Sequence, residues 1–301
     1  MPLLAESGLK IVGSVVAPTT LLTTLLFYFG RLHAQGLTRY LRVHFTVFDF
    51  TVQDYLVRSA DGLFLPVTIA AVVALLSLWI HRLLLGALPV DTRLIVLRVL
   101  APLTGVSGMV LMALALTDTF GNKVFASFPE AGGLSLSIGV LLLAYAVRLL
   151  RLLIAERRSG DLPSSPAGGI AVAEWGAVFI LVSVGLFWAV NSYAIGVGIS
   201  RGQQIERDLG FSPNVVLYSE KSLNLQVPGV REMVCSTPEE MPEVAYRFRY
   251  EGLKFVLQSG NHYLFLPAGW TRNSGVALVI PRSDALRLEF SGPGQGVRAD
   301  C

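Results

Sequence analysis

Charged side chains are scarce in this chain of 301 residues, and cysteine and histidine are scarcer still. Only 15% of the residues are Asp, Glu, Lys or Arg, whereas 53% are hydrophobic; an ordinary soluble domain carries roughly 25% charged residues. Two cysteines exclude a disulfide-dense scaffold, and a net charge of +3 is too small to indicate a nucleic-acid partner. GxSxG, HExxH, P-loop and dinucleotide-binding motifs are missing as well. These absences argue against a soluble enzyme or a cofactor, and they favour a membrane protein.

Long apolar segments fill the first two thirds of the chain. Because a helix needs about 20 apolar residues to cross the hydrocarbon core, five segments qualify, at residues 11–29, 62–80, 99–117, 131–155 and 175–200. The first is longer than the roughly 7–15 apolar residues of a signal peptide, so we interpret it as a retained helix. Residues 1–200 are therefore predicted to form an α-helical bundle of five transmembrane helices.

The connection at residues 31–61 is too aromatic for a free linker. Phe45, Phe48 and Tyr55 recur at about helical spacing. This pattern predicts a surface helix, or else a structured loop packed over the bundle.

The hydrophobic period changes from helical to alternating after residue 200. Apolar and polar residues alternate at 223–227, 246–250 and 286–290, and Ser259–Gly260–Asn261 separates two further apolar runs as a hairpin turn would. About 100 residues are enough to form a core of their own. We expect residues 201–301 to fold independently as a small all-β extramembrane domain of about seven strands.

Metal ligation is the first chemistry to test against these residues. Histidine and carboxylate side chains gather in the 31–61 connection, at His33, His44, Asp49 and Asp54. Both types can ligate zinc, but their spacing puts no two of them on one helical face as HExxH would. Capping and solvation of surface structure is the competing interpretation, and we expect no metal site.

Basic and small residues mark other parts of the bundle. A basic cluster ends the fourth apolar segment, and it sets membrane orientation or binds anionic lipid headgroups; its members are Arg148, Arg151, Arg157 and Arg158. Gly105, Gly108 and Asn191 lie within apolar segments, and we interpret them as helix-packing residues. No ionisable residue lies near the centre of any segment, which argues against an ion-coupled pump.

The orientation follows from the basic residues and the cysteines. The short connections at 81–98 and 148–174 are basic, whereas residues 118–130 are nearly neutral. The positive-inside rule then predicts a cytoplasmic amino terminus and an extracytoplasmic β domain in the plasma (cytoplasmic) membrane. Cys235 and Cys301 both lie in that domain, where an oxidising compartment permits a disulfide.

Two functional hypotheses remain open. The favoured one is a non-enzymatic accessory, assembly or sensor subunit that binds another membrane or envelope protein through its β domain. The alternative is an oligomeric channel or transporter capped by the β domain. A threonine cluster in the first segment is its main support, with members Thr19, Thr20, Thr23 and Thr24. Hydrogen bonding of these hydroxyls to their own helix is the competing interpretation.

Overall fold

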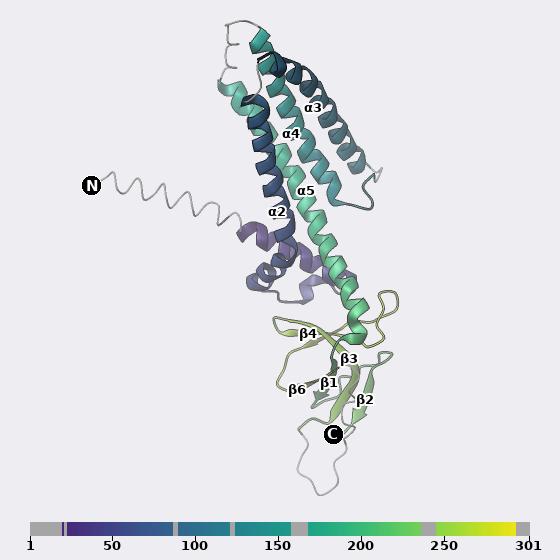
Figure 1. Cartoon of the computed structure of the whole chain (residues 1–301). Coiled ribbons are helices and arrows are strands. Elements are labelled where there is room, and N and C mark those ends of the chain that lie inside the picture. Colours follow the sequence, from purple (N-terminus) through teal and green to yellow (C-terminus); the bar gives the residue numbers. More distant parts are fainter. Residues whose placement is uncertain are drawn as a thin grey trace, which may run out of the picture. The chain divides into compact units, whose positions relative to one another are not determined.

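The computed structural model describes residues 20, 23–86, 90–120, 124–157, 168–235 and 245–292 (Figure 1). The chain divides into two compact units. Leu63–Tyr193 forms one, which we call the helical unit. Met1–Gly62 and Ala194–Cys301 together form the other, which we call the sheet unit.

Four long helices lie wholly within the described residues: α2 (Val52–Gly86), α3 (Val90–Thr119), α4 (Glu130–Arg157) and α5 (Gly168–Asp208). The boundary between the units falls inside α2 and inside α5. Pro66 in α2 and Pro102 in α3 are accommodated within continuous helix. The predicted segments 62–80, 99–117, 131–155 and 175–200 are thus helical throughout or nearly so.

Three helices are long and apolar enough to cross a membrane, over Ile95–Thr119, Glu130–Ile154 and Val172–Phe211. In the first and third of these helices, only 17% of the most apolar stretch is buried inside the structure, so most side chains of that stretch face outward. Such helices need an apolar surrounding. The described apolar stretch of α2 is shorter, Pro66–Ile80, and most of the predicted segment 11–29 lies outside the described residues. The count of five spans is therefore not confirmed.

Glycines bring α3 and α4 together in the helical unit, where the two helices run side by side (Figure 1). A Cβ built on Gly108 would lie 2.9 Å from the Gly139 carbonyl oxygen, and one on Gly139 would lie 3.0 Å from the Gly108 oxygen. Gly105 is less crowded, since its nearest neighbour, the Ala146 Cβ, would be 3.7 Å away. The backbones approach most closely at Gly108.

A second close crossing joins α4 and α5 in the same unit. A Cβ on Gly133 would lie 2.4 Å from the backbone nitrogen of Ala189. The Ser137 hydroxyl lies within hydrogen-bonding distance of the carbonyl oxygen of Gly133 on its own helix, at 3.2 Å, and of Val182 on α5, at 3.1 Å. Ser137, which lies within the apolar stretch of α4, is thus used in helix packing, as interhelical hydrogen bonds commonly are.

The helical part of the sheet unit differs from the single surface helix considered for residues 31–61. Residues 23–40 are helical, and Arg42 at φ +61° follows the end of that helix. A loop with one 3-10 turn, η1 (Phe45–Val47), leads to α2. Thr51 and Asp54 cap α2 reciprocally: each backbone N–H donates to the other's side chain, at 2.9 and 3.2 Å. This capping box starts a new helix at Val52, so the segment is a structured loop between two helices.

The rest of the sheet unit is η2 (Leu209–Phe211) and an antiparallel six-stranded sheet. Its strands are β1 (Asn214–Ser219), β2 (Arg231–Val234), β3 (Phe248–Ser259), β4 (His262–Pro267), β5 (Leu278–Pro281) and β6 (Leu286–Ser291). The order is β5-β4-β3-β1-β6, and β2 pairs with β3. The C-terminal β structure is confirmed.

Individual strands depart from the predicted pattern. Residues 222–227 form no strand, and Asn224 has φ +51°. Leu223 and Leu225 nevertheless pack against the core of the sheet, which explains the alternation. The strand predicted at 246–250 begins at Phe248. The hairpin turn contains two residues, of which Gly260 takes φ +52°, and β2 was not predicted.

The sheet packs against two different sets of side chains. One core belongs to the sheet and the loop after β1, and it includes Val215, Leu217 and Tyr250. The other is shared with the helix 23–40 and the loop after it. Its buried members are Leu37, Tyr40, Leu41, Phe48, Leu209, Leu257, Leu264, Leu266 and Trp270. A domain beginning at residue 201 would lack four of these nine side chains. The predicted division at residues 1–200 and 201–301 stays a prediction.

Candidate functional site

The four candidate metal ligands of the sheet unit have separate partners. The Nδ1 atom of His44 lies 2.7 Å from the Thr46 hydroxyl, and Asp54 caps α2. Asp49 lies against the β3–β4 turn, with a carboxylate oxygen 3.7 Å from Nδ1 of His262. His33 is buried at 5% exposure on the helix 23–40. Among the described residues, no three His, Cys, Asp or Glu side chains form a group that could hold a metal.

The arginines of the predicted basic cluster have different environments. Arg148 is exposed on α4, and Arg151 forms an ion pair with Glu174 of α5, at 2.8 Å. Arg157 is the last residue of α4, and Arg158 lies outside the described residues. Their assignment to lipid headgroups or to membrane orientation stays a prediction.

The remaining predicted residues are only partly described. Asn191 is half-buried on α5, and its packing role stays a prediction. Cys235 is buried and disulfide-bonded. Cys301 lies outside the described residues, so the pairing of these two cysteines also stays a prediction.

Three residues that the sequence analysis did not single out join the helices of the sheet unit to its sheet. Glu206, near the end of α5, accepts a hydrogen bond from the Tyr40 hydroxyl on the helix 23–40. Its other carboxylate oxygen accepts the backbone N–H of Arg272, in the loop between β4 and β5, at 3.0 Å. The Arg272 guanidinium carbon lies 4.6 Å from the centre of the Tyr40 ring, within cation–π range. We call Tyr40, Glu206 and Arg272 the junction.

Glycines hold the helices of the sheet unit at backbone contact beside the junction. A Cβ on Gly198 would lie 2.2 Å from the His33 carbonyl oxygen, and one on Gly202 would lie 2.7 Å from the Tyr40 ring. A Cβ on Gly36 would likewise lie 2.3 Å from the Ile195 carbonyl oxygen. Gly198 and Gly202 are four residues apart, which is the small-xxx-small spacing of closely packed helices. That spacing could have identified the contact from sequence.

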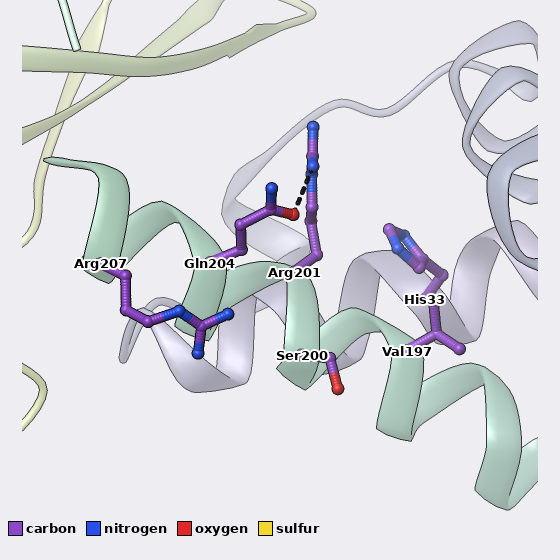
Figure 2. A pocket seen from close by; sticks show the side chains of 6 residues that line it. All are labelled: His33, Val197, Ser200, Arg201, Gln204 and Arg207. Carbon is purple, nitrogen blue, oxygen red and sulfur yellow. Dashed lines mark hydrogen bonds between the residues drawn. The ribbon is translucent and has the colours of Figure 1, made fainter. Parts of the chain in front are cut away.

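A hollow of about 460 Å³ opens beside this contact. Figure 2 shows the six lining residues, His33 from the helix 23–40 and Val197, Ser200, Arg201, Gln204 and Arg207 from α5. The α5 residues recur at intervals of three and four, so they share one helix face. An Arg201 N–H donates to the Gln204 side-chain oxygen at 2.7 Å. The lining is rich in hydrogen-bond donors and positive charge, which suits an anion.

The sheet unit also buries a lysine. Lys254 on β3 is 4% exposed, and its ammonium group donates to the Ser212 carbonyl oxygen at 2.5 Å. Burial lowers the pKa of this side chain, because the charged form loses its water. This hydrogen bond joins β3 to Ser212, which directly follows η2, so the lysine holds that segment against β3.

No family model, curated protein or solved structure matches this chain.

Proposed function

We propose that this protein is an integral membrane accessory or sensor subunit that binds a partner protein through its C-terminal sheet. The junction and the shared core around Tyr40 and Trp270 are the observation that supports the proposal. They tie β3, β4 and the loop after β4 to the helix 23–40 and to the end of α5. A partner that displaces the sheet would therefore act on the ends of two helices.

The sheet has an edge suited to such a partner. β6 pairs with β1 on one side, and no described strand pairs with its other side. Phe290 on this strand is 58% exposed. An open edge strand can accept a strand from another chain through backbone hydrogen bonds, with exposed side chains adding specificity.

The proposal includes five membrane spans, a cytoplasmic amino terminus and an extracytoplasmic sheet in the plasma membrane. The described helices supply three candidate spans, and the short basic connections support the orientation. The disulfide at Cys235 is typical of an oxidising compartment. A membrane-impermeant thiol or tag label applied to intact cells tests the side: a tag after residue 301 should react without opening the cells. Reaction only after lysis would reverse the orientation.

Site-specific photo-crosslinking in native membranes tests partner binding. A photoreactive residue at Phe290 should join the chain to one recurring protein, whereas the same residue at the exposed Gln258 on β3 should not. Products only between copies of this chain would favour the oligomeric channel instead, and no product at position 290 would overturn the proposed edge.

The channel alternative receives no support from the threonines described in the first segment. The Thr24 hydroxyl donates to the carbonyl oxygen of Thr20 on its own helix, at 2.8 Å. This is the local hydrogen bonding that threonine commonly forms in apolar helices.

A further inference from the structure

The hollow between α5 and the helix 23–40 has the chemistry of an anion site. We propose that it binds the phosphate group of an anionic ligand, with a phospholipid headgroup as the source. This site is separate from the β6 edge proposed to bind a protein, and the two can fail independently.

The positive charges of two arginines that line the hollow are not neutralised by an ion pair within the described residues. Neither Arg201 nor Arg207 forms an ion pair with any carboxylate in the described part of the chain. The neighbouring carboxylate of Glu206 is already occupied by Tyr40 and by the backbone N–H of Arg272. Guanidinium groups bind phosphate through paired, charge-assisted hydrogen bonds, so the two arginines supply the donors that a phosphate needs.

Most of the other residues that line the hollow are polar. The Ser200 hydroxyl and the Gln204 amide add donors, while Val197 adds an apolar side chain. His33 contributes a buried imidazole from the facing helix. A hollow of about 460 Å³ is larger than a phosphate alone needs, which leaves room for the glycerol part of a headgroup.

The position of the site along α5 indicates a lipid source. α5 carries no charged residue from Trp175 to Ser200, and its charged residues begin again at Arg201. The apolar part is long enough to cross the hydrocarbon core. The first charged turn after this stretch, at Arg201, is therefore expected at the depth of the headgroups, where phosphate is abundant.

Binding to the purified full-length protein in a non-ionic detergent tests the site, with dioctanoyl phosphatidylglycerol as the lipid probe and inorganic phosphate at matched ionic strength as the free anion. The double variant Arg201→Gln/Arg207→Gln should raise the dissociation constant for the lipid about tenfold or more. Arg39→Gln is the matched control, because Arg39 is exposed on the helix 23–40 and does not line the hollow. It should bind as the wild type does.

The two probes distinguish the sources. Tight binding of the lipid and weak binding of inorganic phosphate supports a headgroup site; arginine-dependent binding of inorganic phosphate at equal affinity supports a site for free phosphate. Equal affinity of the wild type and the double variant, or an equal loss in Arg39→Gln, would overturn the proposal. If the double variant does not fold, the single variant Arg207→Gln gives the same comparison.

Discussion

Single polar groups hold the sheet unit together at the junction. The Tyr40 side chain is 6% exposed, and its hydroxyl donates to Glu206. Tyr40→Phe removes this donor and leaves the ring in place. Because a hydrogen bond to a charged group contributes about 1.5–3 kcal/mol, thermal unfolding in detergent should show a loss of that order.

Tyr246→Phe is the matched control for this substitution. The hydroxyl of Tyr246 has only a long contact, 3.5 Å from the Asp284 carbonyl oxygen. Its removal should change the melting temperature little, and equal effects of the two substitutions would refute the role of the junction.

Lys254 makes stability depend on pH above neutrality. Its pKa in the folded chain lies below the ordinary value of 10.5, because burial disfavours the charged form. Below the folded pKa the ammonium group is charged in both states, and the burial penalty is complete. As pH rises through the folded pKa toward 10.5, the folded chain loses the proton first and becomes more stable.

Chemical unfolding between pH 7 and pH 10 measures this linkage. The wild type should gain stability relative to Lys254→Met as pH rises, whatever the offset between them at pH 7. Lys221→Met, at an exposed position, should show no such trend relative to the wild type. A constant difference between wild type and Lys254→Met over this range would contradict the assignment.

At the scale of elements, helix spacing depends on particular glycines. Gly198 and Gly196 lie two residues apart on α5, but a Cβ on Gly196 would meet nothing within 4 Å. Gly198→Ala must push apart two backbones and should cost about 1–3 kcal/mol of unfolding free energy. Gly196→Ala should cost nothing, and its better helix propensity favours a gain. Equal melting temperatures of the two variants would show that the helices are not in backbone contact at Gly198.

The α3–α4 crossing offers a second pair of glycines for comparison. Gly108→Ala places a methyl group 2.9 Å from the Gly139 carbonyl oxygen, whereas Gly105→Ala makes an ordinary contact of 3.7 Å with Ala146. We expect Gly108→Ala to destabilise the protein by about 1–3 kcal/mol and Gly105→Ala to be tolerated. The measurement is thermal unfolding in detergent, and a greater loss for Gly105→Ala would contradict the geometry.

At the scale of the whole molecule, the sheet depends on residues far away in the sequence. A fragment of residues 210–301 lacks Leu37, Leu41 and Phe48, which share one buried core with Leu264 and Leu266. Burying an aliphatic side chain is worth about 1.5–3 kcal/mol, so the loss is large for a sheet of this size. The fragment should aggregate or melt without cooperativity by circular dichroism. A soluble fragment with a cooperative melt would show that the sheet needs no helix.

The long helices were predictable from the sequence, and so were several strands. Uninterrupted apolar runs predict helices because the backbone must satisfy its own hydrogen bonds in an apolar medium, and α3, α4 and α5 contain the predicted segments. Alternation predicts strands less reliably. It is correct at β6, but at residues 223–227 it reflects a loop that places alternate leucines on the core.

The candidate site was much less predictable. The residues chosen from sequence were separate histidines and carboxylates, and the structure places them in different surroundings: His44 and Asp54 pair with near neighbours in the chain, whereas Asp49 lies beside His262. The hollow and the junction are formed by residues more than 150 positions apart, such as Tyr40 and Glu206. The local sequence around a helical residue does not indicate which distant residue its side chain will contact.

By itself the sequence determined the class of the molecule: apolar helices that a membrane can accept, followed by strands in the last hundred residues. Local composition and period contain that information, because they decide which backbone hydrogen bonds form. Only the tertiary structure decided that residues 23–62 belong with the sheet, that Gly198 touches His33, and that two arginines line one hollow. Hydrophobic periodicity predicts which face of a helix or strand is buried, but it does not predict which segment covers that face. The covering segment is determined by packing between parts of the chain that are distant in sequence.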